Sequence, residues 1–200
     1  LPPIAHDVKV ISIGFFVKDN QPVAWRGPML HRAVEQFLTD VHWGDLDFLL
    51  VDLPPGTGDV AISLGQLLPS AQSLVVTTPQ HTAAMVAERS GAIGLQTGQS
   101  ILGVIENMSY LPTANGPLEL FGAGGGQAVA DRLTEISGTK VTVLGKISIS
   151  QGLRESADDQ MPIVVSNPSD QAAQEISAVA SAIASMPRGL SGKSLRISPS

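Results

Sequence analysis

The chain has 200 residues, a hydrophobic content of 43% and a formal net charge of -6 at neutral pH. This length predicts one domain of ordinary size with a single core. The acidic balance argues against a basic surface for nucleic acid or for an anionic membrane. Cysteine is absent, which excludes a disulfide framework and thiolate ligands for a metal within these residues. No apolar run has the length of a membrane span, so we expect a cytoplasmic protein.

Short apolar runs alternate with helix-like segments along the chain. The runs predict strands at residues 8–17, 48–53, 73–77, 101–105 and 141–147. Helices are expected at residues 29–41, 59–68, 82–96, 127–136 and 172–183. This alternation indicates a three-layer α/β fold with a mostly parallel sheet. We expect residues 1–186 to be part of one domain and residues 187–200, rich in Ser and Gly, to form a flexible tail.

The most informative stretch is residues 48–59, in which an apolar run ends on Asp52 and breaks into a Pro/Gly turn. A short run without alternation is typical of a strand buried on both faces of a parallel sheet. Ligands bind at the carboxyl edge of such sheets. An Asp there, followed by glycines, suits a Mg²⁺ ligand, direct or through water, beside a nucleotide γ-phosphate. The alternative is a strand-end Asp that caps the next helix.

Six motifs, in order, resemble those of the Mrp/ApbC-type P-loop ATPases. At residues 12–15, 25–29, 52–59, 77–80, 106–109 and 121–126 they read Ser-Ile-Gly-Phe, Trp-Arg-Gly-Pro-Met, Asp-Leu-Pro-Pro-Gly-Thr-Gly-Asp, Thr-Thr-Pro-Gln, Glu-Asn-Met-Ser and Phe-Gly-Ala-Gly-Gly-Gly. This family, related to MinD and the nitrogenase iron protein, comprises carriers or assembly factors for iron–sulfur clusters. The resemblance implies the deviant Walker A type of P-loop fold, a homodimer, ATP and Mg²⁺ as ligands, an iron–sulfur cluster, and apoproteins as clients.

The resemblance also assigns roles to individual residues. Asp52 matches the Walker B acid, which is expected to help hold Mg²⁺ through a bound water. Gly56 resembles the switch glycine whose amide meets the γ-phosphate, and Gly58 gives the same loop conformational freedom. Asn107 is expected to pair its amide with the adenine edge, and Pro79 to shape the nucleotide pocket. The alternatives are an ordinary turn residue at Asn107 and a simple strand-to-helix turn at Pro79.

Two features of the family are not found in the sequence. The family has a P-loop with a signature lysine near its amino terminus, so we expect this chain to be the carboxyl-terminal portion of a longer protein, with negligible ATP hydrolysis by these residues alone. Cluster-carrying members have a Cys-x-x-Cys pair in the loop that corresponds to residues 110–120, which contain no cysteine. We therefore expect no iron–sulfur ligands in this segment.

Our interpretation is a nucleotide-switched homodimer that hydrolyses ATP by a positioned water, with cluster delivery as its family role. One alternative is a metal-free, MinD-like positioning or partner-binding ATPase. The missing Cys pair favours it, and the lack of a terminal basic amphipathic helix opposes it. Another alternative is a non-catalytic scaffold, which the missing P-loop favours and the intact loop after Asp52 opposes. Neither nucleic acid nor a membrane is expected as a partner.

Overall fold

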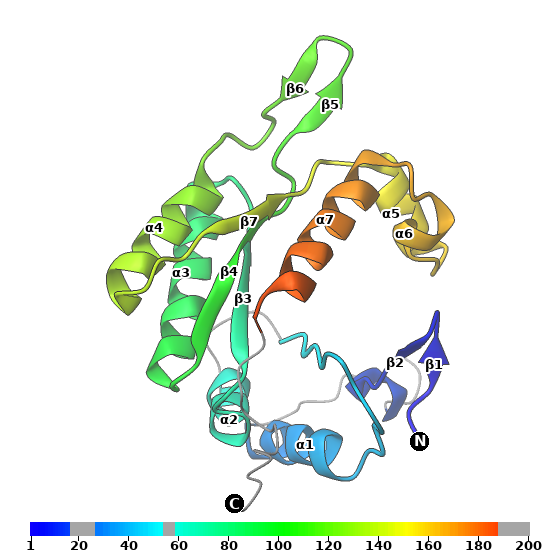
Figure 1. Ribbon diagram of the computed structural model, residues 1–200, viewed down its shortest axis with the longest axis vertical. Helices are drawn as coiled ribbons and strands as arrows, with labels where there is room; N and C mark the ends of the chain where they lie inside the picture. The colour runs from blue at the N-terminus through cyan, green and yellow to red at the C-terminus, as the bar shows by residue number, and fades with distance from the viewer. Residues whose placement is uncertain (17–26, 54–58, 188–200) are drawn as a thin grey trace, which may run out of the picture.

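The computed structural model describes residues 1–16, 27–53 and 59–187. Three parallel strands form its main sheet, in the order β3–β4–β7. The strands are β3 (Gln72–Thr77), β4 (Ser100–Glu106) and β7 (Val143–Lys146). Helices α3 (His81–Gln96) and α4 (Gly125–Ser137) cover one face of this sheet, and α7 (Gln171–Ser185) lies across the other (Figure 1). This three-layer arrangement confirms the predicted fold class.

Two clusters of buried side chains hold the layers together. The larger cluster lies between the sheet and helices α3 and α4, and includes Val104 and Leu133, both 0% exposed. A Cβ atom added at Gly91 of α3 would lie 2.7 Å from the Leu133 side chain, so the two helices approach closely at this glycine. The smaller cluster, built on Ile147 and Val179, joins the end of β7 to α7. Both clusters bury apolar side chains, and such burial supplies the main driving force for folding.

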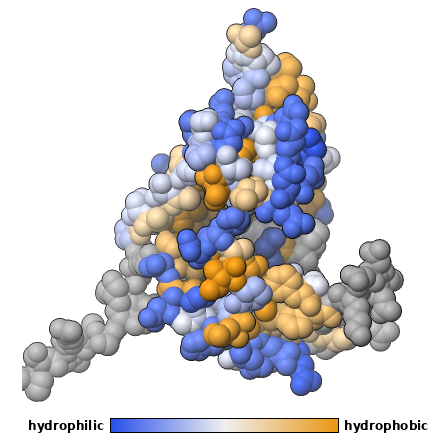
Figure 2. Space-filling view, turned by 90° about the vertical axis from the view of Figure 1, so that its right-hand side faces the viewer, coloured by the Kyte–Doolittle hydropathy of each residue, from blue (hydrophilic) through white to orange (hydrophobic). Residues whose placement is uncertain are grey.

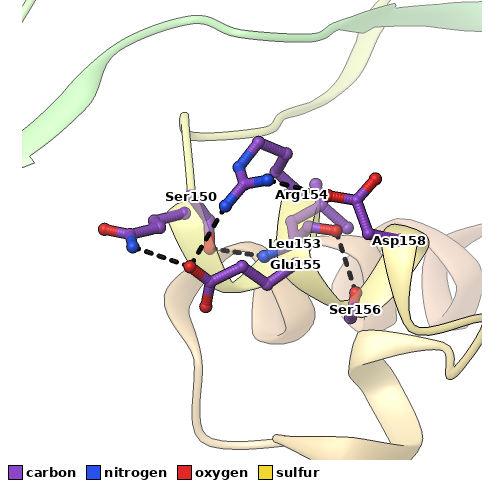
Figure 3. A network of polar contacts seen from close by, with 7 residues as sticks. Ser150, Leu153, Arg154, Glu155, Ser156 and Asp158 are labelled. Atoms are coloured by element: carbon purple, nitrogen blue, oxygen red, sulfur yellow. Dashed lines mark hydrogen bonds and ion pairs between the residues drawn. The ribbon is translucent and has the colours of Figure 1, made fainter.

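Helices α5 (Gln151–Asp158) and α6 (Ile163–Ser166) follow β7 and were not predicted from the sequence. The Ser150 hydroxyl caps α5 by accepting a hydrogen bond from the Leu153 amide at 3.0 Å (Figure 3). The same hydroxyl donates to Asp170 at 2.9 Å, and Asp170 in turn caps α7. Arg154 contacts Asp158 at 2.7 Å along the exposed side of α5. One pair of linked caps therefore sets where α5 and α7 begin.

Helices α1 (Gly27–Thr39) and α2 (Asp59–Leu67) confirm two further predictions from the sequence. The Trp43 side chain donates a hydrogen bond to the Phe37 carbonyl at 2.8 Å, which satisfies an acceptor in the last turns of α1. Lys9 donates to the Trp43 carbonyl and so attaches the amino-terminal residues to the end of this helix. Among the described residues, no helix is long and apolar enough to cross a membrane.

The strand predicted at residues 8–17 is wrong over most of its length. Strands β1 (Ile4–Ala5) and β2 (Val8–Lys9) form a short antiparallel hairpin, and a 3₁₀ helix, η1 (Ile13–Phe16), follows. His6 and Asp7 have φ angles of 48° and 63°, which reverse the chain in a tight turn. The apolar run is therefore divided between two elements, and its last residue, Val17, lies outside the described residues.

Residues 48–53 also differ from the prediction, because they form no strand and lie exposed. The side chain of Leu50 is 87% exposed, and Val51 is 40% exposed. Figure 2 shows apolar side chains gathered over the lower half of the face that it presents. Among the described residues, β4 is the neighbour of β3 in the sheet and no strand pairs with the other edge of β3. In the part of the chain that the structure describes, the apolar run is not a strand of the main sheet, so the sheet does not bury it.

A second hairpin lies where the sequence predicted only a loop. It comprises β5 (Leu111–Thr113) and β6 (Gly116–Leu118), and it projects from the carboxyl edge of the sheet at the top of Figure 1. The Thr113 hydroxyl donates to the Gly116 carbonyl at 2.6 Å and closes its turn. Pro112 and Pro117 face each other across the ladder. This hairpin occupies the loop in which the family resemblance implies a Cys pair.

Candidate functional site

The carboxyl ends of the three parallel strands meet at one edge of the main sheet, below the β5–β6 hairpin (Figure 1). The backbone N–H of Asn107 donates a hydrogen bond to the Thr77 carbonyl at 2.7 Å, which connects the end of β4 to the end of β3. The Ser109 amide donates to the Ile147 carbonyl at 2.9 Å and ties the same turn to the end of β7. Pro79 follows β3 directly. The structure therefore brings Asn107 and the Pro79 turn to one edge, as the sequence predicted.

Asn107 lies in the turn that follows β4, with its side chain partly buried. Its side-chain oxygen accepts a hydrogen bond from the Met108 amide at 2.9 Å. Met108 has a φ of 53°, a left-handed conformation that turns the chain away from the strand. In this geometry the Asn107 side chain stabilises the turn, as the interpretation of Asn107 as an ordinary turn residue requires. Its contact with a base stays a prediction.

Pro79 is buried, and the turn around it supports the start of helix α4. A Cβ atom added at Gly125 would lie 2.5 Å from the Pro79 carbonyl oxygen and 2.6 Å from that of Thr78. These are backbone atoms, which cannot swing aside as a side chain can. The glycines at residues 124–126 therefore let the amino terminus of α4 approach the β3–α3 turn. They form the start of helix α4, with Gly124 at its N-cap.

Glu106 is a functional candidate that the sequence reasoning missed. It is the last residue of β4, and its side chain is 1% exposed. The Gly126 amide donates to its carboxylate at 2.6 Å, the Ser109 hydroxyl lies 2.8 Å away, and the Lys146 ammonium lies at 3.5 Å. A helix amino terminus stabilises an anion at this position. The available signal was a carboxylate that ends an apolar run directly before Asn107.

A second carboxylate, Glu175 of α7, fastens the base of the hairpin. It accepts hydrogen bonds from the Tyr110 hydroxyl at 2.5 Å, from the Ser148 amide at 2.6 Å and from the Ser148 hydroxyl at 2.8 Å. Burial alone would raise the pKa of Glu175, but these hydrogen bonds outweigh it and hold the pKa below its ordinary value. The bond to Glu175, together with burial, raises the pKa of Tyr110 above its usual 10.0.

A cavity of about 500 Å³ lies between the hairpin and the sheet edge. Glu106, Lys146 and Tyr110 line its inner side, and Pro112 and Pro117 of the hairpin line its outer side. Asn107 and Pro79 are not among its lining residues. The cavity is therefore separate from the surface on which the sequence analysis placed the nucleotide base.

The structure does not bring Asp52 to this edge. Residues 40–53 form no strand and run as a trace from the end of α1 through the lower half of Figure 1. Asp52 is exposed. Gly56 and Gly58 lie outside the described residues. Within the parts of the chain that the structure describes, no group of three His, Cys, Asp or Glu side chains could hold a metal ion. The role of Asp52 as a magnesium ligand stays a prediction.

Known proteins resemble this chain over most or all of its length. A protein of Mycobacterium tuberculosis named iron-sulfur cluster carrier protein is 55% identical over 200 residues, which are 100% of this chain and 52% of that protein. A protein of the same name from Bacillus subtilis is 46% identical over 153 residues, covering 76% of this chain and 42% of that protein. The chain therefore spans about half the length of these curated relatives.

Solved structures agree with these matches. The nucleotide-binding protein in complex with ADP from Archaeoglobus fulgidus has 32% identity and a TM-score of 0.57, covering 75% of this chain and 56% of that chain. The cell division ATPase MinD of Pyrococcus furiosus has 22% identity and a TM-score of 0.55, covering 79% and 58%, and shows the shared fold. A family profile described as ParA: NUBPL iron-transfer P-loop NTPase matches residues 1–184. The resemblance found in the sequence is thereby confirmed, and the chain belongs to this family of P-loop NTPases.

Proposed function

We propose that this chain is the carboxyl-terminal part of an ATP-dependent iron–sulfur cluster carrier, hereafter the parent protein, which acts as a homodimer in the cytoplasm and delivers clusters to apoproteins. One observation carries the proposal: relatives named iron-sulfur cluster carrier protein match all 200 residues at 55% identity. Because the chain spans about half of those relatives, the activity belongs to the parent protein. In it, we expect a P-loop upstream of Leu1.

The nucleotide is assigned to the carboxyl edge of the sheet. Asn107 would offer its amide to the adenine edge, and the Pro79 turn would support the pocket wall beside it. Asp52, which these 200 residues alone do not bring to this edge, would hold Mg²⁺ through water in the parent protein. The donor chemistry fits, because protein-bound Mg²⁺ takes one or two carboxylates, with phosphates and waters as its remaining ligands. The exposed Asp52 carboxylate is such an oxygen donor. Gly56 and Gly58 would form the switch loop that follows it.

The cluster is the cargo, and these residues do not fit it as ligands. Iron–sulfur clusters are held chiefly by Cys thiolates, and the chain contains no cysteine. The hairpin at residues 111–118 presents Thr, Asn and Pro side chains instead. In our proposal, the cluster ligands therefore lie outside these 200 residues. A metal-free, MinD-like switch remains the second candidate, since the missing thiolates and the shared MinD fold both favour it.

Anaerobic cluster transfer tests the proposal. The parent protein is loaded with iron and sulfide, separated by chromatography, and mixed with an apoprotein acceptor with and without Mg-ATP. We expect a cluster that survives chromatography and passes to the acceptor at a rate that ATP changes. Asp52→Asn should abolish the ATP effect but keep the cluster. A parent protein that hydrolyses ATP and retains no iron would contradict the carrier proposal and favour the MinD-like switch.

The 200-residue chain is the matched control for both activities. It lacks the amide cradle and the lysine of a P-loop, so we expect negligible phosphate release at saturating Mg-ATP. It also lacks thiolates, so we expect no cluster that remains bound during chromatography. Turnover like that of an ordinary ATPase that Asp52→Asn abolishes, or a stoichiometric cluster on this chain, would show that the site has been misassigned.

A further inference from the structure

We propose that Glu106 is a positioning residue for base recognition: its carboxylate fixes the turn that presents Asn107. The inference rests on the proposed function, because it takes Asn107 as the residue that contacts the base. Glu106 itself is 1% exposed and does not reach the surface on which a base would lie. Its effect on a nucleotide would therefore pass through the turn at residues 106–109.

The first observation is the connection between the carboxylate and the turn. The Ser109 hydroxyl lies 2.8 Å from the Glu106 carboxylate and 2.9 Å from the Glu106 carbonyl, within hydrogen-bond distance of both. Ser109 is 4% exposed, so this contact is largely shielded from bulk water. The backbone of Asn107, between these two residues, is held by the Thr77 carbonyl at 2.7 Å. The turn is thus closed from inside by a side chain that sits one residue before Asn107.

The second observation is how many elements share this carboxylate. The Gly126 amide at the amino terminus of α4 donates to it at 2.6 Å, and Lys146 at the end of β7 lies 3.5 Å away. A buried carboxylate without partners is strongly unfavourable, so its three partners keep it in one place. Through Glu106, the Asn107 turn is therefore held in a fixed position relative to α4 and β7.

This arrangement also defines the role of the glycines in α4. An amino-terminal helix amide is a site at which a ligand phosphate can bind. Here the Gly126 amide is already bonded to Glu106. A Cβ atom at Gly126 would lie 2.8 Å from the Glu106 Cβ, so the close approach requires the glycine. The glycine-rich motif therefore binds the buried Glu106 carboxylate through the Gly126 amide. In this proposal, that contact sets the geometry of the neighbouring Asn107 turn.

The test is the ratio of Mg-ATP to Mg-GTP affinity, measured by calorimetry on the parent protein. Glu106→Gln keeps the side-chain volume and removes the charge. We expect it to lower the ATP/GTP ratio by about tenfold, a typical coupling within one hydrogen-bonded network. Ser109→Ala breaks the contact to the turn with little change in volume and should lower the ratio similarly. Glu175→Gln is the matched control, because Glu175 is also a hydrogen-bonded carboxylate but contacts Ser148 and Tyr110 instead of the Asn107 turn.

A double-mutant cycle separates positioning from general stability. If Glu106 acts through Asn107, Glu106→Gln should lower the ratio no further once Asn107 is replaced by Ala. Wild-type ratios in both Glu106→Gln and Ser109→Ala, beside a reduced ratio in Asn107→Ala, would overturn this inference and leave the proposed base contact standing. A fully additive cycle would also overturn it. A wild-type ratio in Asn107→Ala would overturn the base contact and the role of Glu106 together. If Glu106→Gln does not fold, Ser109→Ala decides.

Discussion

Residues 48–51 and residues 101–105 are both short apolar runs directly followed by a carboxylate, Asp52 and Glu106 respectively, yet they occupy opposite environments. In the second run, Val104 is 0% exposed between helices α3, α4 and the neighbouring strands. In the first run, Leu50 is 87% exposed, and no described strand pairs with it. The difference shows that an apolar run specifies the capacity to be buried. Whether it is buried depends on ladder partners and covering helices supplied by distant residues.

The largest expected difference in unfolding free energy is between substitutions of two leucines, one in the core and one in residues 48–53. Leu133→Ala removes a side chain that is 0% exposed in the larger core cluster, and we expect a loss of about 2–5 kcal/mol in unfolding free energy. Leu50→Ala, at a side chain that is 87% exposed, should change it by less than about 0.5 kcal/mol. Urea unfolding of the 200-residue chain measures both. A similar loss in the two variants would show that residues 48–53 are packed against a core.

Two glycines extend the comparison to backbone packing. Gly125→Ala would place a Cβ atom 2.5 Å from a carbonyl oxygen at the Pro79 turn, so we expect destabilisation of about 1–3 kcal/mol. Gly14→Ala in η1 is the control, since its nearest neighbour would be the Ser12 hydroxyl at 3.4 Å, an ordinary contact. Thermal unfolding compares the two variants. Equal midpoints would mean that the amino terminus of α4 can move away from the β3–α3 turn without cost.

A smaller effect is expected from the Tyr110–Glu175 contact. Tyr110→Phe removes one hydrogen bond at the base of the hairpin and should cost about 1 kcal/mol at pH 7. The folded pKa of Glu175 is lowered, so its contribution is present above the unfolded value near 4.5 and is lost as the pH falls through the folded value.

The measurement is urea unfolding of the wild type and Tyr110→Phe from pH 7 down into the acid range. The difference in unfolding free energy between the two proteins should shrink as the pH falls below 4.5, the ordinary value for Glu175. A difference that stays constant at every pH would show that the Tyr110 hydroxyl contributes independently of the ionised carboxylate.

The sequence predicted the main sheet and its helices because apolar runs and helix-like segments alternate along residues 72–147, in the order β3, α3, β4, α4 and β7, interrupted only by the β5–β6 hairpin. It did not predict β5–β6, although Asn115-Gly116 is a strong hairpin turn, since Pro112 and Pro117 argue against strands on either side. Helix α5 was missed because few of its residues are apolar.

For the candidate site, the sequence placed Asn107 and Pro79 at one edge correctly, from the rule that parallel strands end together. It missed Glu106, because a carboxylate at the end of an apolar run resembles a solvated strand end. Its burial depends on Gly126, which arrives 20 residues later in the chain and donates its amide. The local pattern marks Glu106 as a strand-end carboxylate, but its hydrogen bond to Gly126 is set by the packing of α4.

In our proposal, the carboxyl edge of the sheet recognises a nucleotide base through Asn107. The most direct measurement is the affinity of the parent protein and of its Asn107→Ala variant for Mg-ATP and Mg-GTP. We predict that the variant loses about 1–3 kcal/mol of base recognition, so that ATP/GTP selectivity falls by roughly ten- to a hundredfold, while Asp52→Asn lowers turnover and leaves selectivity almost unchanged. Unchanged selectivity in Asn107→Ala, with only a lower melting temperature, would contradict the claim and leave Asn107 as a turn residue.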